Sequence, residues 1–174
     1  MRSLIGQMAV FVIAAAALGA ARNAIAPGGI DWIGQWADPF ISSSDSTIAR
    51  PTSALPNDPP FLTFEQAKAK HSDPKVIFVD ARYPEDYQQG HMPGAILLPF
   101  EMFDGFWPGV EPRLPRDREI VTYCAGTDCE LSLFLARLLR DKGYEHVEIF
   151  YGGAELWKDN RMPMDTTAAP PPGA

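Results

Sequence analysis

The sequence predicts an α/β domain with a central parallel sheet covered by helices on both faces, preceded by an N-terminal hydrophobic helix. Three short, continuous apolar runs have the length of strands buried in a parallel sheet. A segment with one apolar stripe separates the last two runs and has the period of a helix. An uncharged stretch of 18 residues, 4–21, predicts the N-terminal helix.

The folded part is expected to open with a short helix and a buried strand. Thr63 is the expected N-cap of a helix over 63–70, because Gln66 stands three residues later and completes a capping-box pattern. The apolar run 76–79 follows as the first strand.

The second half of the domain predicts a right-handed strand–helix–strand unit. Strands are expected over 120–123 and 147–150, with a leucine-striped helix over about 130–142 between them. Gly143 follows this helix at a position that favours positive φ. A last short helix is expected after Gly152 and Gly153.

Residues 1–24 predict either a transmembrane anchor or a secretory signal segment. The 18-residue apolar stretch is at the lower limit for crossing a hydrocarbon core of ~30 Å. Arg2 gives the segment a basic start, and the small residues Gly19 to Ala21 would suit signal cleavage. The distribution of cations favours a single-pass anchor with the main domain on the outer, periplasmic face. The alternative is export after cleavage.

Composition divides the rest of the chain. Residues 25–60 form a juxtamembrane segment and a linker rich in Pro and Ser, 61–165 a single domain, and 166–174 a Pro-rich tail expected to be disordered. The 15 cationic and 22 anionic side chains give a formal net charge of −7, which argues against a nucleic-acid partner.

Cys124 is the expected catalytic residue. It follows a predicted strand directly and precedes a predicted helix, where unpaired backbone N–H groups and the helix dipole stabilise a thiolate and a bound anion. The alternative is a buried structural cysteine. The loop expected to bind substrate or an anion comprises Ala125, Gly126, Thr127, Asp128 and Cys129.

A second group of polar residues follows the first predicted strand. Asp80 and Arg82 are expected to pair, Glu85 comes shortly after, and His91 lies in a tight Gly-His-Met-Pro-Gly turn. All four are expected to support the site, with His91 a hydrogen-bonded scaffold residue.

These segments together resemble the rhodanese-like domain. The resemblance rests on Val-Asp-Ala-Arg at 79–82, Gly-His-Met-Pro-Gly-Ala at 90–95, Tyr-Cys at 123–124 and Gly-Gly-Ala-Glu-Leu-Trp at 152–157. It implies a sulfurtransferase in which Cys124 carries sulfane sulfur as a persulfide, between a small sulfur donor and a thiol acceptor. It implies no metal and no organic cofactor, and the His and Cys residues form no ligand set.

The loop departs from the usual rhodanese pattern. It lacks an Arg or Lys, and Cys129 stands where an Arg is common, as in a family variant with Cys-x4-Cys-x2-Ser. The missing cation disfavours a phosphatase, which needs a loop Arg on the transferring group. It also favours a neutral or singly charged donor over thiosulfate.

Two alternatives remain open. Cys124 and Cys129 are close enough in sequence to form a disulfide, which would make the domain a thiol–disulfide redox or sensor domain. Cys129 is equally a candidate resolving cysteine that releases sulfur from Cys124, or a packing residue. The third class is a non-catalytic rhodanese-fold binding module.

Overall fold

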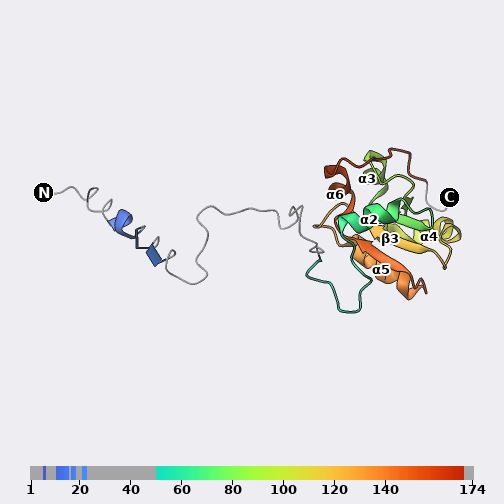
Figure 1. Ribbon diagram of the computed structural model, residues 1–174, viewed down its shortest axis with the longest axis horizontal. Helices are drawn as coiled ribbons and strands as arrows, with labels where there is room; N and C mark the ends of the chain where they lie inside the picture. The colour runs from blue at the N-terminus through green and yellow to red at the C-terminus, as the bar shows by residue number, and fades with distance from the viewer. Residues whose placement is uncertain (1–5, 7–10, 16, 19–20, 23–49, 171–174) are drawn as a thin grey trace. The chain divides into compact units, whose positions relative to one another are not determined.

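The computed structural model describes residues 6, 11–15, 17–18, 21–22 and 50–170 (Figure 1). The chain divides into two units, 1–43 and 44–174. The described N-terminal residues are helical with exposed side chains. Among the residues that the structure describes, no helix is both long enough and apolar enough to span a bilayer. Most of the segment predicted as anchor or signal, and residues 25–49 of the predicted linker, lie outside the described residues.

The second unit is built on a parallel sheet of four strands in the order β2-β1-β3-β4. The strands are β1 Val76–Asp80, β2 Ile96–Leu97, β3 Glu119–Tyr123 and β4 Val147–Phe150. The α/β class and the three predicted strands are therefore confirmed. The two-residue β2 adds an edge strand that the sequence analysis did not predict.

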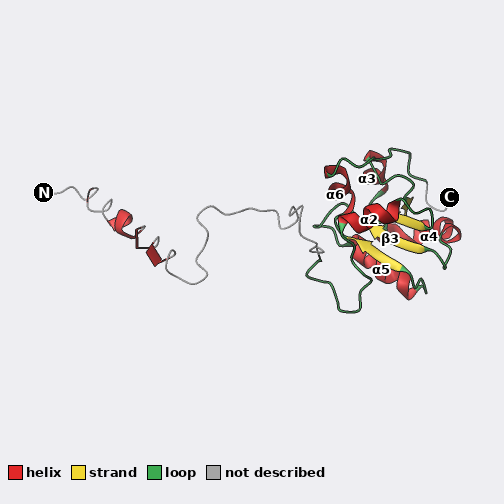
Figure 2. Ribbon diagram, in the orientation of Figure 1, coloured by secondary structure: helices red, strands yellow, loops and turns green. Residues whose placement is uncertain are grey.

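Helices cover both faces of this sheet (Figure 2). The α-helices of the unit are α2 Phe64–His71, α3 Pro84–Gln89, α4 Phe103–Val110, α5 Leu131–Asp141 and α6 Gly153–Asp159, with 3₁₀ turns at η1 Phe100–Met102 and η2 Glu111–Arg113. The expected ends of two helices are confirmed: Thr63 and Gln66 form the capping box of α2, and Gly143 has a φ of 88° after α5.

Alternate residues of the strands form two cores. On one face Phe78, Val121 and Phe150 pack with Ala67 of α2 and Trp157 of α6. On the other face, the cluster contains Val79, Ile120 and Ile149 together with buried residues of α4 and α5. Because helices cover both faces, the carboxyl ends of β1, β3 and β4 lie between two helical layers. In open parallel sheets, ligands bind at the loops that follow these strand ends.

Residues 51–60, here called the strap, pack against α5. Arg137 of α5 donates from Nε and Nη2 to the carboxylate of Asp58, at 2.7 Å in each case. These hydrogen bonds hold the pKa of Asp58 below its ordinary value of 3.8. Ser53 donates to Glu130, the residue that precedes α5, at 2.6 Å. Part of the predicted linker is therefore in contact with the domain.

Candidate active site

Cys124 lies at the carboxyl end of β3, next to the end of β1. Asp80 pairs in register with Tyr123, and the N–H of Ala81 donates to the Tyr123 carbonyl at 2.9 Å. Cys124 is 1% exposed. The sequence-predicted nucleophile and the Asp80–Arg82 pair therefore share one edge of the sheet.

Hydrogen bonds from the start of α6 hold the loop from Cys124 to Cys129. The N–H of Ala154 donates to the Cys124 carbonyl at 2.9 Å, and the N–H of Glu155 donates to the Ala125 carbonyl at 2.8 Å. Two consecutive loop carbonyls are thus turned towards α6.

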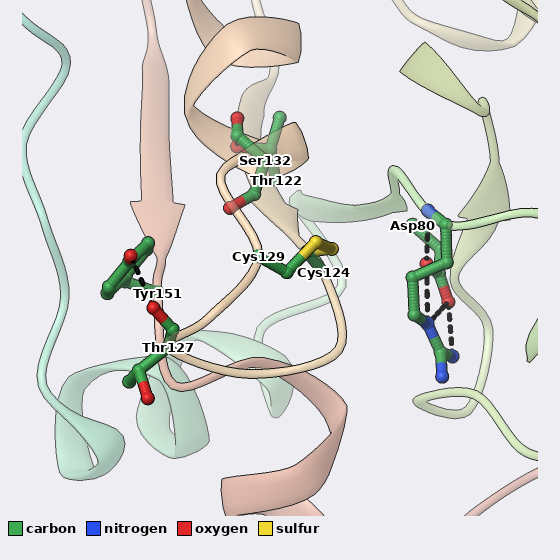
Figure 3. The surroundings of a disulfide bond; sticks show 8 residues. Asp80, Thr122, Cys124, Thr127, Cys129, Ser132 and Tyr151 are labelled. Atoms are coloured by element: carbon green, nitrogen blue, oxygen red, sulfur yellow. Dashed lines mark hydrogen bonds and ion pairs between the residues drawn. A yellow bond between two sulfur atoms is a disulfide. The ribbon is translucent and has the colours of Figure 1, made fainter. Parts of the chain in front are cut away.

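The next two carbonyls of the loop are also engaged. The Tyr151 hydroxyl donates to the Thr127 carbonyl, as Figure 3 shows. The N–H of Cys129 donates to the Gly126 carbonyl at 3.1 Å, which closes a turn at the end of the loop. All four carbonyls from 124 to 127 therefore have donors.

The backbone N–H groups of the loop differ from its carbonyls in this respect. Within the described part of the chain, the N–H groups of residues 125–128 make no hydrogen bond. Successive free N–H groups on a curled backbone can form an anion-binding nest, provided that they converge. Four successive N–H groups that follow Cys124 are therefore available as hydrogen-bond donors among the described residues.

Cys124 and Cys129 form a disulfide, with their Cα atoms 6.1 Å apart (Figure 3). The pairing that the sequence left open is therefore present in this structure. In this oxidised form Cys124 has no free thiol, so sulfur chemistry on Cys124 requires reduction first. Cys129 is partly exposed, in contrast to Cys124.

Thr122 fixes the first turn of α5 over the sheet. Its hydroxyl is buried and donates to the Ser132 carbonyl at 2.9 Å. Because Ser132 is the second residue of α5, this contact sets where the helix starts relative to β3, and with it the end of the Cys124–Cys129 loop.

Asp80 and Arg82 form a buried ion pair beside this loop. Arg82 donates from Nη2 to Asp80 at 2.6 Å and from the same nitrogen to the Gly90 carbonyl at 2.8 Å. Burial alone would lower the pKa of Arg82, but the hydrogen bonds with Asp80 and the negative charge of Asp80 together raise that pKa. Burial and the nearby Asp80 charge also raise the pKa of Tyr123, which stays neutral. Arg82 is therefore bound to neighbouring groups of the domain, and Asp80 compensates its positive charge.

His91 has scaffold contacts. Its ring stacks on Tyr87 with centroids 3.5 Å apart, and Nδ1 lies 2.8 Å from the Tyr87 carbonyl. Nε2 lies 3.4 Å from the Thr167 hydroxyl in the segment after α6. Glu85 is exposed on α3, where it makes no hydrogen bond or ion pair with the described residues. His91 is thus held by contacts within the domain, whereas Glu85 has none of these contacts among the described residues.

The rim of the loop is acidic. Asp128 is exposed, and a side chain at Gly126 would meet the carboxylate of Glu155, which thus lies against the loop. Arg137, the first cation after the loop in the sequence, is bound to Asp58. Across the described residues, no three His, Cys, Asp or Glu side chains form a group that could hold a metal ion.

Three functional positions escaped the sequence analysis as site residues. They are Tyr151 in the β4–α6 connection and Gly153 and Glu155 in the first turn of α6, all of which contact the loop from 20 or more residues after Cys124 along the chain. The Gly152–Gly153 pair after a strand was the available signal: Gly153 has a φ of 60°, and its missing side chain leaves room for the Cys124 carbonyl.

Comparison with known proteins identifies the same domain. The family model of the rhodanese-like domain matches residues 63–160. The chain is 38% identical over 95 residues to the HTH-type transcriptional regulator Rv0324 of Mycobacterium tuberculosis, with 54% of this chain and 39% of that protein covered. It is 30% identical over 89 residues to a sulfurtransferase of Allochromatium vinosum, with 51% and 78% covered.

The fold is also found among solved structures. The thiosulfate sulfurtransferase of Pseudomonas aeruginosa superposes with a TM-score of 0.55 at 21% identity, covering 67% of this chain and 22% of that one. At this identity the likeness concerns the fold alone. The chain spans about two fifths of the length of the Mycobacterium regulator and most of the length of the Allochromatium protein.

Proposed function

We propose that this chain, which belongs to the family of rhodanese-like domains, is a sulfurtransferase that carries sulfane sulfur as a persulfide on Cys124 at a membrane surface. One observation carries the proposal. Cys124 directly follows β3 and begins a loop whose carbonyls from 124 to 127 are engaged, while the N–H groups of 125–128 make no hydrogen bond with the residues that the structure describes. A thiolate and a terminal persulfide both need such donors.

The first step loads sulfur onto the reduced protein. The Cys124 thiolate attacks the outer sulfur of a donor persulfide, R–S–SH. A new S–S bond forms, the bond to the donor's inner sulfur breaks, and R–S⁻ leaves. The free loop amides stabilise the negative charge on Cys124 before attack and on its persulfide afterwards.

The second step uses Cys129 as the resolving cysteine. Its thiolate attacks the inner sulfur of the Cys124 persulfide, the disulfide forms, and the outer sulfur leaves as hydrosulfide. The disulfide in the structure supports this step, since the two sulfurs reach bonding distance within this fold. A thiol acceptor that attacks the outer sulfur instead would take the sulfur as its own persulfide.

The charges around the loop favour a donor with little negative charge. Asp128, Glu130 and Glu155 are acidic, and the charge of Arg82 is matched by Asp80. A dianion such as thiosulfate would meet repulsion without a compensating cation. We expect a neutral or singly charged persulfide of low molecular weight to load faster than thiosulfate.

A single-turnover experiment tests this function. Reduced wild-type protein receives one equivalent of a cysteine persulfide donor, and both hydrosulfide and the Cys124–Cys129 disulfide are quantified. We expect the two products in equal amounts. In Cys129→Ser, hydrosulfide should form much more slowly until excess external thiol is added, because only the one equivalent of cysteine released by the donor is present, and in Cys124→Ser it should not form. Equal turnover by Cys124→Ser and wild type would contradict the proposal.

The disulfide also favours a second candidate, a thiol–disulfide redox or sensor domain. Such a domain would exchange electrons with protein thiols without taking up sulfur. Oxidation of a model dithiol by the disulfide form, with no sulfur uptake by the reduced form, would select this function. If Cys124→Ser preserves the cellular role, a binding module without catalysis is selected instead.

The location of the domain is part of the proposal. Residues 1–24 would tether it to the outer face of a membrane, where disulfides persist. Carbonate extraction of membranes and sequencing of the mature N-terminus separate an uncleaved anchor from a cleaved signal. Release into the soluble fraction with an intact N-terminus would contradict both.

A further inference from the structure

The two sulfurs of the disulfide differ in how a second molecule can reach them. Cys124 directly follows the central strand β3 and is 1% exposed. Cys129 is partly exposed, and its neighbour Asp128 is exposed. Thiol–disulfide exchange depends on which sulfur an incoming thiolate can approach. Access favours attack at Cys129.

The two sulfurs also differ as leaving groups. Cys124 leaves into a loop whose N–H groups at residues 125–128 have no hydrogen-bond partner among the described residues, and its neighbours in sequence carry no negative charge. Cys129 lies between Asp128 and Glu130, whose carboxylates oppose negative charge on its sulfur. The sulfur that carries a negative charge more readily leaves faster. The exposure of Cys129 and the stability of the Cys124 thiolate as a leaving group therefore both favour attack at Cys129, which expels Cys124.

We propose that Cys129 is the sulfur through which external thiols reduce this domain. An incoming thiolate bonds to Cys129 Sγ, the bond to Cys124 Sγ breaks, and its electron pair leaves on Cys124. A second thiol then attacks the mixed disulfide, so two thiols are oxidised to one external disulfide while both cysteines become free thiols. The inference deepens the proposed function, because this opening generates the Cys124 thiolate that accepts sulfur.

The charge around Cys129 selects the class of thiol. Asp128 and Glu130 are the sequence neighbours of Cys129, so their negative charges let cationic and neutral thiols approach this residue more easily than anionic ones. One charge at ~6 Å in water changes an encounter by roughly three-fold. The domain should therefore be opened by a positively charged thiol, or by a protein thiol on a basic surface.

Mapping the first mixed disulfide tests the direction of attack. The oxidised full-length protein is mixed with cysteamine, quenched in acid within the first turnover, and treated with a maleimide. Cleavage before Asp128 puts Cys124 and Cys129 on different peptides. We expect cysteamine on Cys129 and maleimide on Cys124. The reverse pattern, or equal amounts of both, would overturn the inference.

Kinetics test the charge selection in parallel. Cysteamine should open the disulfide faster than mercaptoethanesulfonate, with rates compared per thiolate. Asp128→Asn should lower that ratio about three-fold or more. Asp117→Asn is the matched control: Asp117 is exposed at the opposite end of β3, roughly 20 Å away along the strand and beyond the screening length of ~8 Å. Equal ratios in wild type and Asp128→Asn would overturn the charge selection.

These outcomes are independent of sulfur transfer. If cysteamine maps to Cys129 but Cys124 never loads sulfur, the proposed function fails and the direction of reduction stands. If Cys124 loads sulfur but thiols map to Cys124, only this inference fails.

Discussion

Gly153→Ala should displace the loop that carries Cys124. Gly153 has a φ of 60°, where a side chain is strained. A Cβ there would lie 2.7 Å from the carbonyl oxygen of Ala125 and closer still to that of Cys124. Both carbonyls are backbone atoms, so no side-chain rotation relieves the contact. The hydrogen bonds from Ala154 and Glu155 to these carbonyls would lengthen or break.

The cost follows from two contributions. A non-glycine residue in the left-handed region costs about 1–2 kcal/mol. The two lost hydrogen bonds cost about 0.5–1.5 kcal/mol each. Together they predict a fall of about 2–5 kcal/mol in the free energy of unfolding, measured by urea denaturation.

Gly94→Ala is the matched control. Gly94 has a φ of 75°, but a Cβ there would meet nothing within 4 Å. The substitution therefore introduces backbone strain without a steric clash. We expect a loss of about 1–2 kcal/mol. Sulfur loading onto Cys124 should fall about ten-fold or more in Gly153→Ala, since misplaced reacting groups are costly, and stay near wild type in Gly94→Ala. Equal losses of stability, or unchanged loading in Gly153→Ala, would refute the reasoning.

Three further substitutions probe the supports of the site. Asp80→Asn should cost about 3–5 kcal/mol in urea denaturation, because it leaves Arg82 buried without its counter-ion; a loss below 1 kcal/mol would contradict the role of the pair. Asp58→Asn should cost about 1–3 kcal/mol at neutral pH by removing charged hydrogen bonds to Arg137. Because the pKa of Asp58 is lowered on folding, its contribution is present above pH 4 and is lost as the pH falls through the folded-state pKa; a gap between variant and wild type that persists at the lowest pH would contradict this sign. Tyr151→Phe should cost about 1 kcal/mol and speed amide exchange in the Cys124–Cys129 loop, with unchanged exchange as the contrary result.

The sequence predicted those parts of the fold that have a local pattern. The runs 76–79, 120–123 and 147–150 are predominantly apolar because both faces of their strands are covered, and this apolar character identifies them. β2 has two residues and therefore no period. α4 contains two glycines and Pro108, which weaken the helical signal of the sequence, and the packing of Phe103 and Phe106 stabilises the helix in the fold.

The features of the candidate site likewise divide into those with a local sequence signal and those that arise only when the chain folds. Cys124 could be singled out because a thiol between a strand and a helix has a local meaning. The strap could not be predicted, because Asp58 is separated from Arg137 by 79 residues and only the folded chain brings them together. The disulfide likewise depended on the path of the loop, which the contacts from Tyr151 and the start of α6 determine.

The mass of the peptide that contains Cys124 tests the central claim most directly. Reduced Cys129→Ser protein, which cannot close the disulfide, is exposed to a persulfide donor and cleaved before Asp128. A gain of ~32 Da on the Cys124 peptide, reversed by a thiol, is the predicted result. An unmodified peptide under conditions in which the donor remains active would contradict the account.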